Sequence, residues 1–161
     1  MAEKKEITIR LATRKDVPLI LEFIKKLATY EGSLHRVSAT EELLNEWMFD
    51  KKSAEVAFAL VDGKEVGFLL FYECFAAFLG RTVMYIGEFF VEEEYRGYGC
   101  GDKLFKYIAE LGLERGCSRV EWCCFDWNES SVGFYMRRGA APIKDCSIYR
   151  LGEAEMKKVV E

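Results

Sequence analysis

The stretch Arg96-Gly97-Tyr98-Gly99-Cys100-Gly101 decides the fold, because it separates a β-rich run from an amphipathic helical pattern. Glycines at a strand-to-helix junction let the backbone approach an anion closely and leave several N–H groups without partners. The helix that follows adds partial positive charge at its N-terminus. This junction is therefore suited to bind a pyrophosphate group.

The spacing of these glycines excludes two common nucleotide motifs. A Rossmann fingerprint needs its third glycine at position 102, and a Walker A loop needs glycine at 102 and Ser or Thr at 104. The sequence has Asp102 and Leu104 at these positions. The remaining pattern is Arg-x-x-Gly-x-Gly.

Hydrophobic periodicity predicts the elements on both sides of the loop. We expect strands over 7–11, 54–61, 65–72, 82–91, 118–125, 141–143 and 146–151, with a hairpin turn at Asp62-Gly63. We expect helices over 17–28, behind a Ser38-x-x-Glu41 capping box, over 104–113 and after Asn128. This order predicts an α/β fold with one mixed sheet and helices on both faces. Nothing resembles a repeat or a linker, so we expect a single domain over residues 1–161.

Composition narrows the classes of partner. The 161 residues carry a net charge of −4, and the basic residues fall in scattered pairs, so no stripe matches a run of nucleic-acid phosphates. The most apolar run, 66–80, contains Glu73 and is shorter than the roughly 20 residues that span a bilayer. We expect neither a nucleic acid nor a membrane as partner, and a neutral or cationic small substrate fits the charge better.

The six cysteines suggest reduced thiols. A core of this size needs no disulfide staples, and the N-terminus has no apolar signal segment, so we expect a cytoplasmic protein. The cysteine spacings give no zinc pattern, and His35 is the single histidine, so we expect no metal.

Several segments together resemble the GNAT superfamily of N-acetyltransferases, and within it the spermidine/spermine and thialysine acetyltransferases. The resemblance extends over essentially the whole chain. It is carried by Leu27-Ala28-Thr29-Tyr30-Glu31, Glu88-Phe89-Phe90-Val91, Tyr95 with the glycine loop, Trp127-Asn128-Glu129-Ser130-Ser131 and Phe134-Tyr135-Met136-Arg137-Arg138-Gly139-Ala140. It implies a mostly antiparallel sheet that is splayed at an acetyl-CoA site, transfer of an acetyl group to a primary amine, and a homodimer.

The resemblance also implies roles for individual residues. Backbone groups of Phe89, Phe90 and Val91 would pair with the pantetheine arm, and Asn128 and Ser131 would lie near the cofactor. The pyrophosphate would be held by Arg96, Gly97, Tyr98, Gly99, Cys100, Gly101 and Asp102. Tyr135 would give a proton to the departing thiolate, and the N–H of Phe90 or Val91 would stabilise the oxyanion.

The sequence departs from polyamine acetyltransferases at the expected base. Those enzymes have a glutamate followed by an acidic residue before the Phe-Phe-Val triplet, whereas this chain has Gly87 and Glu88. Successive strand residues face opposite sides, so Glu88 replaces that glutamate only if a β-bulge turns it inward. Glu31, Glu88, Asp126 and an ordered water chain are the candidates for the base or for substrate binding.

Two other functions stay open at this point. Because Gly87 stands where the base is expected, the chain is alternatively an acyl-CoA sensor without catalysis. An apolar segment over 75–79 would also suit a peptide groove, which would make the acceptor a protein lysine or N-terminus, although a buried strand or a dimer contact explains it as well.

Overall fold

A computed structural model describes residues 5–161, which form a mixed sheet with helices. The elements are β1 (Ile7–Leu11), α1 (Val17–Tyr30), α2 (Glu41–Leu44), β2 (Glu55–Val61), β3 (Lys64–Ala76), β4 (Arg81–Val91), α3 (Cys100–Glu114), β5 (Val120–Trp122), α4 (Glu129–Met136) and α5 (Glu153–Val159). Contacts divide the chain into two compact units, one that ends at Cys123 and one that runs from Cys124 to Glu161. Within the described residues, no helix combines the length and the apolar character needed to cross a membrane.

The first unit contains a five-stranded sheet in the order β1-β2-β3-β4-β5. Neighbouring strands are antiparallel except β4 and β5, which pair in parallel over three positions, Met84 to Ile86 on β4. Since β5 ends at Trp122 and β4 continues to Val91, the last five residues of β4 have no partner on β5. The predicted mixed and mostly antiparallel sheet is confirmed.

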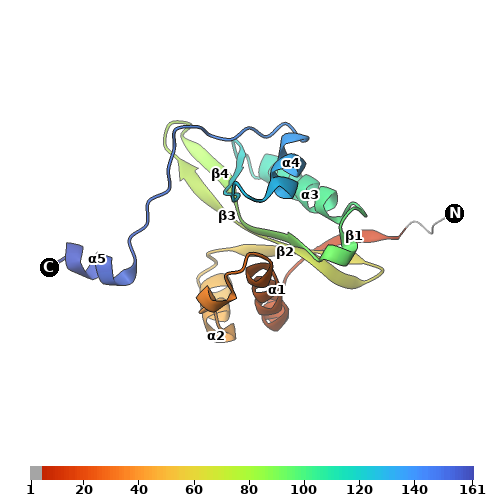
Figure 1. Ribbon diagram of the computed structural model, residues 1–161, viewed down its shortest axis with the longest axis horizontal. Helices are drawn as coiled ribbons and strands as arrows, with labels where there is room; N and C mark the ends of the chain where they lie inside the picture. The colour runs from red at the N-terminus through yellow and green to blue at the C-terminus, as the bar shows by residue number, and fades with distance from the viewer. Residues whose placement is uncertain (1–4) are drawn as a thin grey trace. The chain divides into compact units, whose positions relative to one another are not determined.

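Each face of the sheet has its own hydrophobic core. α1 and α2 cover one face, where Phe23 stacks on Phe68 with ring centroids 5.4 Å apart. α3 covers the other face, where Leu104 and Ile108 pack on strand residues such as Leu69 (Figure 1). Helices therefore lie on both faces, as the order of elements predicts.

Local sequence signals explain several element boundaries. Asp62 and Gly63 both have positive φ angles, 50° and 83°, as a two-residue type I′ hairpin requires. Gly99 precedes α3 with φ 95°, a conformation that glycine adopts without steric cost. Asn128 caps α4 by accepting a hydrogen bond from the Ser131 N–H at 3.2 Å. These three signals confirm the predicted elements.

Two predictions at the ends of elements are wrong. Thr40, rather than Ser38, caps α2, because its hydroxyl accepts from the Leu43 N–H. The strands expected over 141–143 and 146–151 do not form in the described chain, where these residues are exposed and α5 follows. A strand needs a neighbouring backbone, which alternation alone does not supply, and Pro142 has no N–H to donate.

Candidate active site

A β-bulge at Gly87 determines which residues β4 presents to α1. Leu70 on β3 pairs with Glu88 and Phe71 pairs with Ile86, so Gly87 is the extra residue on β4. An added Cβ at Gly87 would lie 2.8 Å from Cδ2 of Leu70, closer than side chains normally approach. Glycine therefore fits this bulge without displacing Leu70.

The bulge reverses the alternation of side chains along β4. Ile86 lies in the core under α3, whereas Phe90 lies in the core under α1, although an unbroken strand would put both on the same face. Glu88 is two residues before Phe90, beyond the bulge, and therefore also faces α1. The β-bulge that the sequence analysis requires is therefore present, and Glu88 faces the side of the sheet that a glutamate at position 87 of an unbroken strand would face.

Glu31 follows α1 and brings a second carboxylate to this face. Burial, followed by the nearby negative charge of Glu31, raises the pKa of Glu88 to about 7. Burial also raises the pKa of Glu31, while the positive charge of Arg36 lowers it. Glu88 keeps contact with solvent, so its proton can exchange. The two acids thus form a pair that carries a proton near neutral pH.

An aromatic and cationic cluster joins the end of α1 to β4. The rings of Tyr30 and Phe90 are 6.2 Å apart, and the Arg96 guanidinium lies 4.7 Å from the centre of the Tyr30 ring. Arg96 Nε also donates to the carbonyl oxygen of Val91 at 3.0 Å. Arg96 therefore lies at the edge of β4 that β5 leaves open.

The glycine loop has the features of an anion site. Gly97 and Gly99 have φ angles of 81° and 95°, and α3 begins directly after them. In the part of the chain that the structure describes, the N–H groups of residues 97–101 donate to no backbone carbonyl. Cys100 is buried, and burial raises the pKa of its thiol. N–H groups without a backbone acceptor and the helix N-terminus suit a phosphate or pyrophosphate.

The remaining predicted site residues belong to the second unit. Tyr135 is buried on α4, and burial followed by the charge of Cys124 raises the pKa of its phenol, so the hydroxyl stays protonated at neutral pH. Asn128 and Ser131 form the cap of α4. Asp126 is exposed.

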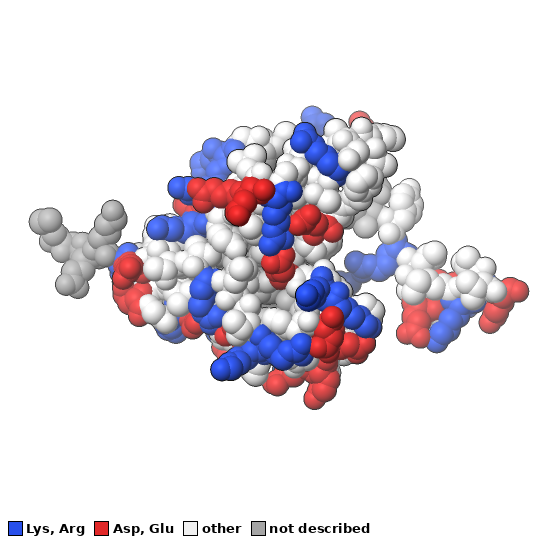
Figure 2. All heavy atoms as spheres, turned by 180° about the vertical axis from the view of Figure 1, so that it is seen from behind, with Lys and Arg blue, Asp and Glu red and all other residues white. Residues whose placement is uncertain are grey.

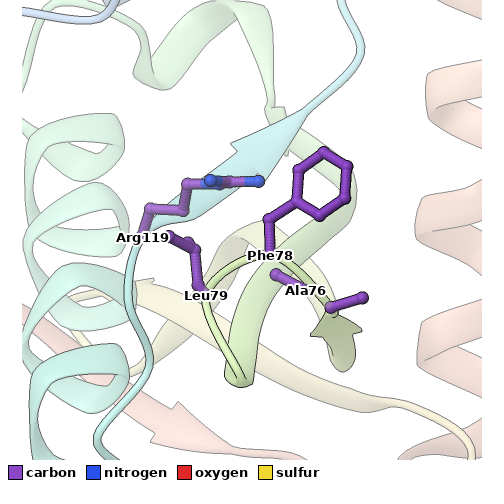
Figure 3. Close-up of a pocket in the computed structure, with 5 residues that line it drawn as sticks. Ala76, Phe78, Leu79 and Arg119 are labelled. Atoms are coloured by element: carbon purple, nitrogen blue, oxygen red, sulfur yellow. The ribbon is translucent and has the colours of Figure 1, made fainter.

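A cavity lies elsewhere, at the tip of the β3–β4 hairpin. It measures about 420 Å³ and is lined by Ala76, Ala77, Phe78, Leu79 and Arg119 (Figure 3). The hairpin tip is six residues along β3 from Leu70, the partner of Glu88, which is roughly 20 Å at 3.3 Å per residue. Phe78 is fully exposed, so the interpretation of 75–79 as a buried strand is wrong. The cavity contains no acid for a cationic amine.

Sequence reasoning left the bulge as an open condition and missed the charge of Arg36. A glycine inside a strand pattern is a recognised signal of a bulge, so Gly87 offered the information. Arg36 had no comparable signal, because its proximity to Glu31 depends on the turn that follows α1.

Replacing Glu31 with Gln should lower the pKa of Glu88 below about 7, because it removes the like charge. Burial remains, so the pKa should stay above the ordinary value for glutamate. A carbon-detected NMR titration of the Glu88 carboxyl measures this change. Glu94→Gln, at an exposed acid, is the matched control and should leave the pKa unchanged. An unchanged Glu88 pKa in Glu31→Gln would contradict the interaction between the two acids.

Comparison with known proteins shows the family of this chain. Residues 21–140 match the acetyltransferase (GNAT) family. The chain is 32% identical over 148 residues to a thialysine N-epsilon-acetyltransferase from Sus scrofa, with 86% of each chain covered. It is 28% identical over 189 residues to an L-ornithine N5-acetyltransferase from Arabidopsis thaliana, with 89% of this chain and 83% of the relative covered. An integron cassette protein of V. cholerae has a similar structure, with a TM-score of 0.78 at 25% identity, covering 96% of this chain and 98% of the other. The chain belongs to the GNAT acetyltransferase family and is an N-acetyltransferase.

Proposed function

We propose that the chain transfers an acetyl group from acetyl-CoA to a primary amine of a small substrate, by direct attack within a ternary complex. The observation that carries the proposal is the bulge, which turns Glu88 toward Glu31 on the strand whose open edge leads to the glycine loop. The relatives are named for thialysine and ornithine, which are both amine substrates. We further propose that residues 1–161 act as a single domain, and the homodimer and the cytoplasmic location stay predictions.

The glycine loop supports binding of the CoA pyrophosphate. Backbone N–H groups of residues 97–101 would hold its oxygens, and the N-terminus of α3 would favour its negative charge. Asp102 would contribute its backbone N–H, because its carboxylate would repel a phosphate. When bound, acetyl-CoA supplies a thioester carbonyl that an amine can attack.

The open edge of β4 supports the pantetheine arm and identifies an oxyanion donor. The Glu92 N–H donates to Val66 on β3, and backbone groups alternate in direction along a strand. The Val91 N–H therefore points toward the open edge, and the Phe90 N–H points toward β3. Of the two predicted oxyanion donors, Val91 is the better placed.

Glu88 is our candidate for the general base. An amine attacks only when it is deprotonated, and its free ammonium has a pKa near 10.4 if it resembles lysine. A carboxylate whose pKa is about 7 accepts a proton more readily than an ordinary glutamate at neutral pH. Glu31 would then bind positive charge on the substrate, and Asp126 has no feature that favours it as a base.

Tyr135 is our candidate for the general acid. Its raised pKa keeps the phenol protonated, which suits a group that donates to a departing thiolate. Asn128 and Ser131, at the start of the same helix, would lie near the cofactor.

The proposed reaction predicts release of free CoA thiol when acetyl-CoA and a suitable amine are both present. The assay uses thialysine, ornithine, diamines, spermidine and lysine-containing peptides as acceptors, with mass spectrometry of the products. Thiol release with a small amine supports the proposal. Tight CoA binding without turnover of any amine would favour the sensor, and turnover of peptides alone would favour a protein acceptor.

Glu88→Gln should lower kcat/KM by about 100-fold, within the range for loss of a general base. In the wild-type enzyme the carboxylate form is the active base, so activity should rise as the pH increases through about 7. The Gln variant should lose this rise, which a pH profile of thiol release measures. Glu94→Gln should keep it. A Gln variant with the same rise in the same pH range would exclude Glu88 as the base.

Tyr135→Phe should lower kcat by about 100-fold, because the thiolate leaves without a proton donor. Affinity for CoA should change little, since the ring and its burial are retained. Steady-state kinetics and calorimetric titration with CoA measure the two quantities separately. Unchanged turnover would remove Tyr135 from its proposed role.

A further inference from the structure

The turn after α1 brings a positive charge to the acidic pair. The Glu31 N–H donates to Leu27, and the Ser33 N–H donates to the Ala28 carbonyl at 2.7 Å, which folds the chain back on the helix. A short helical turn then places Arg36 five residues after Glu31, with its N–H bonded to Ser33 at 2.9 Å. Glu31 and Arg36 therefore lie at the two ends of one tight turn.

Arg36 differs from the arginines that stabilise the fold. Arg10 bridges Asp16 and Glu65, and Arg115 bridges Glu55 and Glu73. Arg36 is exposed and forms no ion pair with any residue from 5 to 161. Its charge nevertheless acts on Glu31, whose pKa it lowers. Arg36 is thus near the acids and available to a ligand.

The wider surface gives no guide to the charge of the acceptor. Lysine, arginine and acidic side chains are interspersed on the face of the molecule in Figure 2, without a broad area of one sign. The charge of Glu31 acts on Glu88 of β4, and the charge of Arg36 in turn acts on Glu31. A long polycation would gain from Glu88 and Glu31 but would be repelled by Arg36.

We propose that Arg36 determines acceptor specificity by binding the α-carboxylate of an amino acid that carries a distal primary amine. Glu31 binds the α-ammonium of that amino acid, and Glu88 takes the reacting amine. This inference rests on the proposed function and specifies the acceptor for the same site.

The chemistry of the guanidinium suits this role. Its planar N–H groups match the two oxygens of a carboxylate and can bind them in a bidentate manner. A diamine with the same chain length has the distal amine and lacks the carboxylate, so it leaves Arg36 without a partner. The contact is the same in the ground state and the transition state, so it should act on KM more than on kcat.

Two substrate pairs isolate the carboxylate. Lysine and cadaverine differ only by it, as do ornithine and putrescine. With the wild-type enzyme, kcat/KM should be higher for the amino acid in each pair by about tenfold, the discrimination expected for one hydrogen-bonded charged group that is partly exposed to solvent.

The variant Arg36→Ala should remove this preference. It should raise KM for lysine and ornithine by about tenfold, leave kcat nearly unchanged and leave cadaverine and putrescine within about twofold of the wild-type values. Arg36→Glu should invert the preference toward the diamines. Arg81→Ala removes an exposed arginine at the far end of β4 and is the matched control, which should behave like the wild-type enzyme.

The outcomes separate this inference from the proposed function. Equal kcat/KM within each pair, or an equal effect of Arg36→Ala on both members, overturns the role of Arg36 and leaves the acetyltransferase proposal intact. If none of the four amines is acetylated while CoA binds, the proposed small-amine function fails, and the role of Arg36 fails with it.

Discussion

The two-residue period of a β-strand determines which face of the sheet each side chain of β4 takes. One extra residue at Gly87 reverses this assignment for the residues that follow it. Before the bulge, Met84 and Ile86 lie in the core under α3. After the bulge, Phe90 lies in the core under α1. Glu88, two residues before Phe90, faces the same side of the sheet. Without the bulge, an acid at position 88 would face the hydrophobic core under α3, where an unpaired carboxylate is costly. The bulge therefore allows this acid to face α1 at all.

Several charged groups surround Glu88, the acid next to the bulge. Partial burial and the second acid at Glu31 raise the pKa of Glu88, while the guanidinium of Arg36 lowers the pKa of Glu31. Lys26 on α1 bonds Glu92 at 2.5 Å and fixes the helix against the end of β4. The position of the acidic pair thus depends on packing and ion pairs on both sides of it.

The sequence predicts the fold well where local chemistry determines the backbone. Asp62-Gly63 requires left-handed conformations that form a tight hairpin, and Asn128 supplies a cap that needs only its own helix. Prediction fails where the partner is distant along the chain. Residues 146–151 alternate like a strand, but no neighbouring backbone pairs with them in the described chain. For the candidate site, the glycine loop was recognisable from spacing, whereas the side of the sheet that Glu88 faces required the register of β3 against β4.

The edge of β4 beyond the end of β5 connects the fold to the chemistry. Val91 directs its backbone groups to the open edge, and Arg96 occupies only its carbonyl oxygen, so the N–H remains for a ligand. Arg96 also lies over Tyr30, whose ring contacts Phe90 at a tilted angle, and this contact links the open edge to the face where Glu88 lies. Four consecutive residues of one strand therefore present an acid on a face and an amide at an edge. A reaction that needs a base and an oxyanion donor can use this arrangement with few dedicated side chains, because the strand geometry itself sets their relative positions.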